Sequence, residues 1–220
     1  MKRAVPVIEV KDLFMVFGNL NVLKKINFLV NSGEKLAIVG PSGTGKSTIL
    51  KILAGLVLPT SGILKIFGEE QNYLRLDQDN PPDVRLVFQN PALLGSLTIE
   101  DNVGFILNRN KNVPKKHIKA LVNECLEEVG LFDVAHKLPN ELSGGMQKRV
   151  SFARALISEP KEKNENKPLL LFDEPTAGLD PIASTRIEDL INKTNDKVKG
   201  SSIVVSHVLS TIERTSTKVL

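Results

Sequence analysis

The sequence contains no tryptophan, one tyrosine (Tyr73) and one cysteine (Cys125). The lack of tryptophan and the single tyrosine argue against a stacking platform for single-stranded nucleic acid. A single cysteine excludes an internal disulfide and suits a reducing compartment, and its place in an apolar stripe indicates a packing role. No apolar run approaches the roughly 18 residues that a membrane-spanning helix needs. The basic start of the chain lacks the apolar segment of a secretory signal, so we expect none there.

Neither sign of charge is in large excess. The net charge of +4 and the pI near 9.1 come from lysines scattered among acidic residues. This pattern indicates solvated faces and at most a weak attraction to anionic lipid head groups, and charge alone does not exclude nucleic acid. With 41% hydrophobic and 25% charged residues among 220, the chain can bury a core and fits one domain, without an internal repeat.

The spacing of apolar residues predicts an α/β fold. Short apolar segments bounded by turn residues predict strands over 7–10, 14–17, 26–30, 36–39, 63–67, 84–88, 169–172 and 202–205. Helical spacing predicts helices over 46–56, 145–157 and 182–192, and an apolar stripe from Ile118 to Val129 that we assign to the core. The segment 159–168 has no apolar residue and predicts a solvated loop.

A glycine-rich segment, GPSGTGKS at residues 40–47, directly follows an apolar run. Strand, tight turn and helix start therefore occur in the order that a nucleotide phosphate site needs. The three glycines allow the backbone to turn and to direct successive N–H groups at phosphate oxygens. Lys46 adds a charge for the β- and γ-phosphates, Ser47 can ligate magnesium, and the helix start adds the positive end of its dipole.

A second segment, LLLFDE at residues 169–174, predicts a buried strand that ends in two acids. Carboxylates at the C-terminal edge of a parallel strand face the ligand-binding edge of the sheet. We expect Asp173 to hold magnesium through water, and Glu174 to orient and deprotonate a water that attacks the γ-phosphate. The pattern is weak alone, but the phosphate loop upstream strengthens it.

A third segment, LSGGM at residues 142–146, precedes the predicted helix 145–157. Ser143 is a good N-cap, and the paired glycines expose backbone N–H groups at a positive helix end. These features predict a second anion site. A plain helix cap explains the same residues, so the segment alone leaves its role open.

The order of these motifs resembles the ATP-binding subunit of ABC transporters over nearly the whole chain. The matching motifs are the phosphate loop, Gln89, the LSGG segment, the acidic strand, AGLD at 177–180 and SH at 206–207. The resemblance implies a P-loop NTPase core of the RecA-like type with a parallel sheet. It also implies an N-terminal antiparallel β-subdomain and a helical subdomain inserted at about 90–160, all within one domain over 1–220.

The resemblance further implies that two subunits sandwich two ATP molecules head to tail, with Lys46 of one facing Ser143 of the other across the same γ-phosphate. Gln89 would sense magnesium and contact the membrane partner, Asp180 would lie at the dimer seam, and His207 would contact the γ-phosphate. The implied catalytic residues are Glu174, His207 and Gln89, and the implied Mg²⁺ residues are Ser47, Gln89 and Asp173. The implied ATP-binding residues are Phe17, Gly40, Pro41, Ser42, Gly43, Thr44, Gly45, Lys46, Ser47, Thr48, Ser143, Gly144, Gly145 and Asp180.

Phe17 matches the aromatic residue that stacks on adenine in this family. Without that match, an aromatic residue in a strand would predict core packing. Two departures narrow the resemblance: Met146 stands at the fifth signature position, where glutamine is usual, and the polar insert 159–167 lengthens the link to the acidic strand.

Met146, LTIEDNV at 97–103 and PTAGLDPIAS at 175–184 are similar to the Mla-type ATPases of phospholipid-trafficking transporters, which work with MCE proteins. The insert most resembles that of the cyanobacterial and chloroplast branch of these ATPases. The implied partners are an integral membrane permease subunit, an MCE-type substrate-binding protein and a second copy joined through ATP, with no nucleic acid. The implied location is peripheral, on the cytoplasmic face of the inner or plasma membrane, or stromal in a plastid.

The family usually continues past the histidine through a final strand pair and a short C-terminal helical region. This sequence stops at residues 216–220. The resemblance therefore implies that the C-terminal end is truncated, which would leave an unpaired strand edge.

Two other functions stay open. A soluble ABC ATPase acting on DNA or ribosomes typically carries a long coiled-coil insertion or a second ATPase copy, and neither is present. The other is a regulatory ATPase that signals across a membrane to cell-wall enzymes. The insert and Met146 argue mildly against it. The leading expectation is an ATP hydrolase that drives a membrane transporter.

Overall fold

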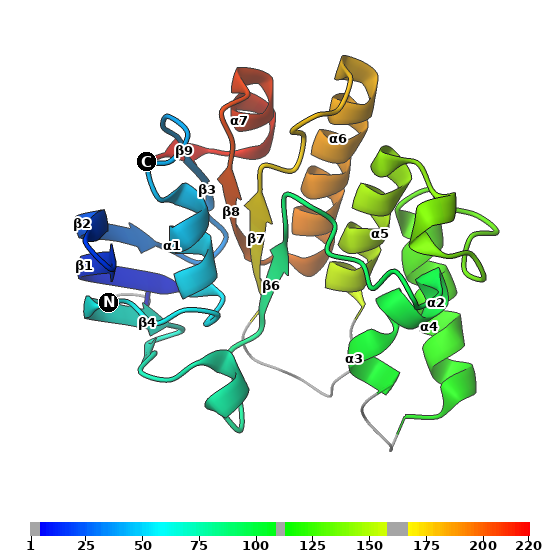
Figure 1. The fold of residues 1–220 in the computed structure, drawn as a ribbon, viewed down its shortest axis with the longest axis horizontal. Helices are drawn as coiled ribbons and strands as arrows, with labels where there is room; N and C mark the ends of the chain where they lie inside the picture. Colours follow the sequence, from blue (N-terminus) through cyan, green and yellow to red (C-terminus); the bar gives the residue numbers. More distant parts are fainter. Residues whose placement is uncertain (1–4, 109–112, 158–166) are drawn as a thin grey trace.

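Residues 5–108, 113–157 and 167–220 are described by the structure, which is a computed structural model. They form two sheets (Figure 1). The antiparallel sheet has the order β2-β1-β4-β5 and contains β1 (Ile8–Phe17), β2 (Leu20–Val30), β4 (Ser61–Ile66) and β5 (Glu69–Glu70). The parallel sheet has the order β6-β7-β8-β3-β9 and contains β3 (Lys35–Ile38), β6 (Val84–Val87), β7 (Leu169–Asp173), β8 (Ser201–Val205) and β9 (Lys218–Val219).

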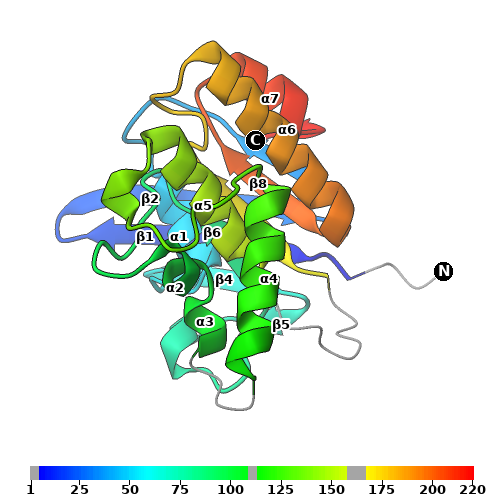
Figure 2. The same cartoon turned by 90° about the vertical axis from the view of Figure 1, so that its right-hand side faces the viewer.

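Helices cover both faces of the parallel sheet. They are α1 (Lys46–Leu53), α2 (Ile99–Val103), α3 (Phe105–Asn108), α4 (Lys115–Glu128), α5 (Gly144–Leu156), α6 (Pro181–Val198) and α7 (Leu209–Thr215), with short 3-10 turns at η1 (Arg75–Asp77) and η2 (Pro139–Glu141). Helix α5 packs against α2, α4 and α6. Figure 2 shows this helical side of the molecule, with α4 and α5 facing the viewer.

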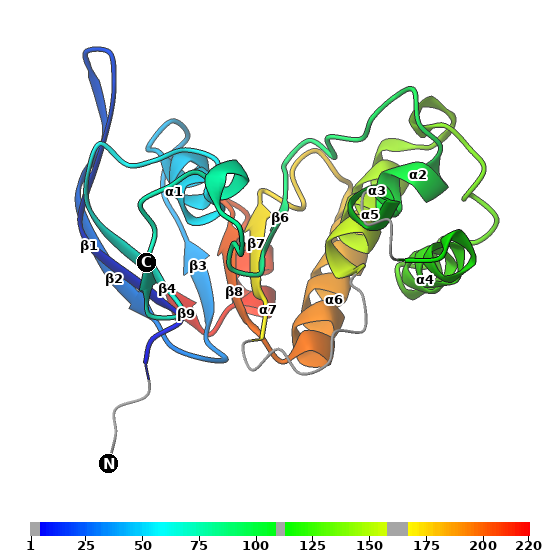
Figure 3. The ribbon, with the colours of Figure 1, turned by 90° about the horizontal axis from the view of Figure 1, so that it is seen from below.

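Strand β7 separates two hydrophobic cores because its side chains alternate between the two faces of the sheet. Leu169 and Leu171 pack with β1, β2, β4 and α1, whereas Leu170 and Phe172 pack with α4, α5 and α6. All five residues of β7 are buried, as in a central parallel strand. Figure 3 shows the result: α1 lies on one side of β6 and β7, and α5 lies on the other.

The prediction of two short strands over 7–10 and 14–17 is wrong. A single strand, β1, runs through both and contains register shifts around Asp12, whose φ is 47°. Asn27 of β2 stabilises this bulge. The Asp12 amide donates to Asn27 Oδ1 at 2.9 Å, and Asn27 Nδ2 donates to Asp12 Oδ1 at 3.1 Å. A cross-strand pair therefore bridges a polar interruption that would otherwise end the strand.

Helix α6 is longer than the predicted 182–192, since it continues to Val198 and ends at Lys199 in the left-handed conformation. Its last turns bury Thr194 and Asn195 rather than apolar residues. The hydrophobic pattern therefore stops before the helix does. The apolar stripe of α4 is confirmed as core, since Ile118, Val122, Cys125, Leu126 and Val129 are all buried.

The predicted solvated loop 159–168 lies outside the described residues except for its last two positions, and so do the first four residues of the chain. Within the described ranges, no helix combines the length and the apolar character that crossing a membrane requires.

Candidate nucleotide site

The loop between β3 and α1 has the backbone that a phosphate cradle needs. Gly40, Gly43 and Gly45 have φ values of 154°, 80° and 91°, a region that favours glycine. Gly45 is also a point of close approach: a Cβ there would lie 2.8 Å from Leu23 Cδ2 and 2.9 Å from Val22 Cγ1 of β2. The antiparallel sheet therefore packs directly on the loop, and only glycine fits between them.

The backbone amides of this loop have no hydrogen-bond acceptors among the described residues. Within the described chain, the backbone N–H groups of residues 42–45 donate no hydrogen bond. Lys46 Nζ donates to the carbonyls of Gly40 and Pro41, each at 2.8 Å, and Thr44 Oγ1 donates to Pro41 at 2.9 Å. The ammonium group is thus held across the loop, next to the free amides. This donor set fits the oxygens of a nucleotide phosphate.

The acidic strand meets the loop at one edge of the sheet. Ser47 Oγ donates to Asp173 Oδ1 at 2.9 Å, although the two residues are far apart in sequence. Burial raises the pKa of Asp173, while the Ser47 hydrogen bond and the charges of Lys51 and Lys46 oppose that rise. No group of three or more His, Cys, Asp and Glu in the described ranges could hold a metal. Mg²⁺ here would therefore depend on the oxygens of Ser47, Asp173 and Gln89 together with water and phosphate oxygens, which are the ligands that it prefers.

Glu174 follows Asp173 in an unusual backbone conformation. Its φ is 44°, its amide donates to Val205 of β8 at 2.9 Å, and its side chain is 11% exposed. His207 Nδ1 lies 2.9 Å from both carboxylate oxygens of Glu174. Only the approach to Oε1 has hydrogen-bond geometry, so the buried Oε2 has no hydrogen-bond partner among the described residues. A buried carboxylate oxygen without a donor is suited to accept one from a bound water.

Ser143 caps α5, as predicted, and accepts a hydrogen bond from the Met146 amide at 3.3 Å. Met146 packs against the helical core. Gln147, the next residue, donates to the carbonyls of Pro139 and Leu142 at 2.9 Å and 3.1 Å, which anchors the turn before the cap. Figure 3 shows the start of α1 and helix α5 on opposite sides of β6 and β7. In this chain Ser143, Gly144 and Gly145 are therefore not part of the phosphate loop's surroundings.

Four further predicted residues lie on other parts of the described chain. Gln89 is exposed just after β6, and Thr48 is partly buried in α1. Phe17 ends β1 next to the β1–β2 turn and is 50% exposed, so it is not core. Asp180 caps α6: its Oδ1 accepts from the amides of Ile182 at 3.0 Å and Ala183 at 2.9 Å.

The structure thus joins the phosphate loop, Asp173, Glu174 and His207 at the C-terminal ends of β3, β7 and β8, where the nucleotides of open α/β sheets bind. The ABC transporter family matches residues 23–177, which is most of the chain. The chain belongs to the ABC transporter family.

Individual members of the family are similar to this chain. The chain is 44% identical over 223 residues to the Protein TRIGALACTOSYLDIACYLGLYCEROL 3, chloroplastic, of Arabidopsis thaliana, covering 97% of this chain and 65% of that protein. It is 38% identical over 204 residues to the intermembrane phospholipid transport system ATP-binding protein MlaF of Haemophilus influenzae, covering 91% and 74%. Other relatives are named for import of sulfate/thiosulfate or methionine. The chain spans less than two thirds of the Arabidopsis protein.

A solved structure shares the fold. The dimeric post-hydrolysis state of the ATP-binding cassette MJ0796, bound to ADP and Pi, has a TM-score of 0.79 at 30% identity, covering 94% of this chain and 91% of that one. The predicted family and P-loop NTPase fold are therefore confirmed. The predicted ATP hydrolase class and ATP binding are confirmed at the level of the family. The roles of individual residues stay predictions.

Two basic residues of the ABC domain's α5 were missed by sequence reasoning. Lys148 Nζ donates to the carbonyl of Ala177 at 2.6 Å and lies 3.3 Å from that of Pro175, directly after Glu174. Arg154 donates to the carbonyls of Pro91 and Ala92, each at 2.8 Å, directly after Gln89. Burial lowers the pKa of both side chains. Arg154 could have been found from the sequence, because it lies one turn after the buried Val150 and therefore on the same face of α5.

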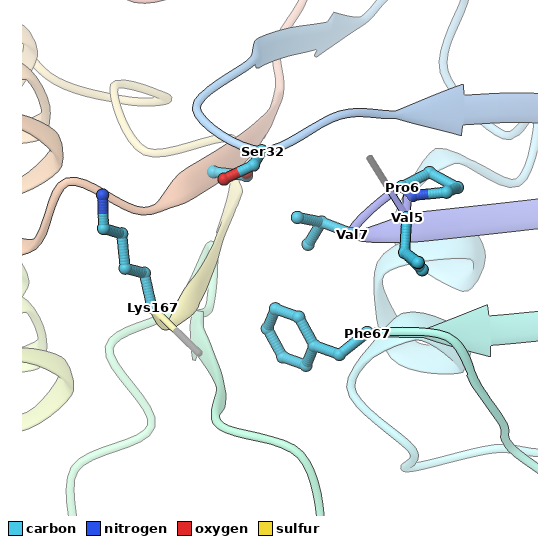
Figure 4. Close-up of a pocket in the computed structure, with 7 residues that line it drawn as sticks. Val5, Pro6, Val7, Ser32, Phe67 and Lys167 are labelled. Atoms are coloured by element: carbon cyan, nitrogen blue, oxygen red, sulfur yellow. The ribbon is translucent and has the colours of Figure 1, made fainter. Parts of the chain in front are cut away.

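A separate cavity of about 250 Å³ lies at the other end of the parallel strands (Figure 4). It is lined by Val5, Pro6, Val7, Ser32, Phe67, Lys167 and Ser201. Lys167 precedes β7 and Ser201 begins β8, whereas the predicted site residues follow the ends of these strands. None of the predicted site residues lines this cavity.

Proposed function

We propose that this chain is the ATP-hydrolysing domain that powers a membrane transporter of phospholipids or related lipids. One observation supports the ATPase part. Lys46 and the free loop amides lie at the same sheet edge as the Ser47–Asp173 and Glu174–His207 pairs. The lipid part is supported by the similarity to a phospholipid transport ATP-binding protein and to a chloroplast protein named for a galactolipid.

The residues divide the reaction between binding and proton transfer. The free amides of residues 42–45 and Lys46 would bind the β- and γ-phosphates of ATP. Glu174 would accept a proton from a water whose oxygen attacks the γ-phosphorus, while the bond to the bridging oxygen of ADP breaks. His207 would orient Glu174 and contact the γ-phosphate. Mg²⁺, held by Ser47, Asp173 and Gln89, would neutralise phosphate charge.

A complete site would need two chains. Ser143, Gly144 and Gly145 present a capped, positive helix start that lies away from the phosphate loop of their own chain. We place them on the γ-phosphate bound by a second copy, with Asp180 at the seam and Phe17 stacked on adenine. The dimeric ADP- and Pi-bound relative supports this arrangement.

We place the chain beside an integral membrane permease, which Gln89 would contact, and an MCE-type lipid-binding protein. The domain would lie peripherally on the cytoplasmic face of the membrane, or on the stromal side in a plastid. The chloroplast relative supports the plastid variant. Import of a small solute is the second candidate, because other relatives carry such names.

The replacement Glu174→Gln tests the ATPase assignment. Removal of a general base slows a reaction by about a hundred- to ten-thousand-fold, whereas the cradle that binds ATP is unchanged. The full-length variant should therefore bind ATP normally, hydrolyse it at least about a hundredfold more slowly, and accumulate an ATP-dependent dimer on gel filtration. Normal turnover would remove Glu174 as the base.

Co-purification from the native membrane tests the lipid assignment. We expect a multi-span permease and an MCE protein to accompany the full-length protein. Recovery with a solute-binding protein would favour import instead. Recovery with nucleic acid, or with a membrane protein coupled to cell-wall hydrolases, would favour the corresponding alternative function.

A further inference from the structure

A largely buried polar network joins α6, α7 and the turn after β7. Thr176, Thr211 and Glu188 are 3%, 0% and 1% exposed. Thr176 Oγ1 lies 2.9 Å from Thr211 Oγ1, and Thr211 Oγ1 lies 2.8 Å from Glu188 Oε1. Arg214 Nε completes the network at 2.9 Å from Glu188 Oε2. We call these four residues the Thr176–Glu188 network.

The charge at one end fixes the direction of every hydrogen bond. A carboxylate paired with an arginine can only accept, so Thr211 donates its one hydroxyl proton to Glu188. Thr211 must then accept from Thr176, whose hydroxyl proton is committed as well. Ser210 Oγ also donates to Glu188 Oε1, at 3.4 Å. Such a fully satisfied, oriented chain of buried hydrogen bonds resists rearrangement.

The network joins the two segments that carry Glu174 and His207. Thr176 lies in the turn closed by the hydrogen bond from the Ala177 amide to the Glu174 carbonyl, at 3.1 Å. Thr211 lies in α7, which begins two residues after His207. The hydrogen bond between the threonines therefore ties the turn of Glu174 to the helix that follows His207.

The Glu174 backbone needs such support. A φ of 44° is unfavourable for a glutamate and persists only when the surrounding structure holds it. Helix α7 is short, with seven residues, and Arg214 fastens it to α6 through Glu188 and through Asp189 Oδ1 at 2.7 Å. Without the hydroxyl of Thr211, the turn of Glu174 would lose its only side-chain hydrogen bond to α7 among the described residues.

We propose that Thr211 and Glu188 are positioning residues. They hold the side chains of Glu174 and His207 in the relative position that attack of a water on the γ-phosphate requires. They act through Thr176 and contact neither nucleotide nor water themselves. This inference rests on the proposed function, since it assigns the attacking water to Glu174. It predicts an effect on the chemical step rather than on ATP binding, because no hydrogen bond or ion pair among the described residues joins the phosphate loop to the network.

The test compares Thr211→Val with Thr211→Ser in the full-length protein. Valine keeps the shape and removes the hydroxyl, so kcat for ATP hydrolysis should fall about ten- to a hundredfold, as misplacement of reacting groups does, with KM within about twofold. Serine keeps the hydroxyl and should restore kcat. Thr194→Val is the matched control, because Thr194 of α6 is equally buried and its hydroxyl has no partner. The control should retain wild-type kcat.

A double variant separates positioning from general loosening of the fold. In a Glu174→Gln background, the base that the network positions is already lost, so adding Thr211→Val should change the residual kcat by less than about twofold. A full additional loss would overturn the inference, as would a wild-type kcat in Thr211→Val. If Thr211→Val is poorly folded, Thr176→Val removes the donor at the other end and must give the same pattern.

The outcomes also distinguish this inference from the proposed function. Normal turnover of Glu174→Gln overturns the proposed function, and the positioning role falls with it. Loss of turnover in Glu174→Gln together with a wild-type kcat in both Thr211→Val and Thr176→Val overturns the positioning role alone.

Discussion

Cys125 shows at the scale of one residue how burial sets chemistry in this domain. Its side chain lies on the core face of α4 and is 8% exposed. Burial, with the Glu128 carboxylate adding to it, raises the pKa of the thiol from 9.0 to about 11. Because the thiolate is the reactive form, the folded protein holds a sulfur that is both covered and protonated at physiological pH.

We therefore predict that Cys125 resists alkylation in the native protein. At pH 8 the two-unit rise in pKa lowers the thiolate fraction about a hundredfold, and coverage lowers access further. Iodoacetamide should label Cys125 slowly in buffer and rapidly in denaturing urea, as measured by mass spectrometry. Since the folded pKa is the higher one, stability should be insensitive to this group below pH 9 and fall as pH rises from 9 to about 11. Equal labelling rates in the two conditions would contradict this assignment.

Single residues were predictable from sequence where their role depends on close neighbours in the chain. The cap at Ser143 and the packing of Cys125 follow from local patterns, and both were expected. The Asp12–Asn27 pair and the Thr176–Thr211 bond join residues 15 and 35 positions apart. No local pattern marks such pairs, because the fold alone brings them together.

At the scale of elements, α5 connects the segments that carry the predicted site. Its first residues form the LSGG cap, Lys148 holds the carbonyls after Glu174, and Arg154 holds those after Gln89. Ala92 is in the left-handed conformation, with a φ of 50°, so the segment that Arg154 holds is strained. A shift of α5 would therefore move both segments together.

We predict that Arg154→Ala lowers the free energy of unfolding by about 2–3 kcal/mol, since it removes two charge-assisted hydrogen bonds from a partly buried guanidinium. Urea denaturation measures this change. Arg186→Ala is the control, because Arg186 is exposed on α6 and makes no hydrogen bond among the described residues, and it should change stability by less than about 0.5 kcal/mol. Similar losses in the two variants would show that Arg154 does not hold the segment after Gln89.

Whole elements were predictable where a buried face is apolar. The stripe of α4 has that property and was found. The C-terminal turns of α6 were missed because Thr194 and Asn195 form their buried face. The β1 bulge was missed because its stabilising partner lies on another strand.

At the scale of the whole molecule, one chain carries two predicted anion-binding segments that lie apart. The phosphate loop follows β3, whereas the LSGG cap begins α5 on the other side of β6 and β7 (Figure 3). A single γ-phosphate can contact both only if they come from different chains. Two-fold symmetry then forms two such sites at once, since each chain offers one copy of each segment.

We therefore predict that Ser143→Arg abolishes ATP turnover but leaves the ATP affinity of a single chain within about threefold, because the bulk of arginine obstructs the seam and not the loop. Ser143→Ala is the control for loss of the cap, which costs about 1 kcal/mol of stability. Lys46→Ala should weaken ATP binding itself. Mixing Ser143→Arg with Lys46→Ala should restore turnover, since the intact loop of the first then faces the intact Ser143 of the second. A large loss of affinity in Ser143→Arg, with no recovery on mixing, would mean that Ser143 acts within its own chain.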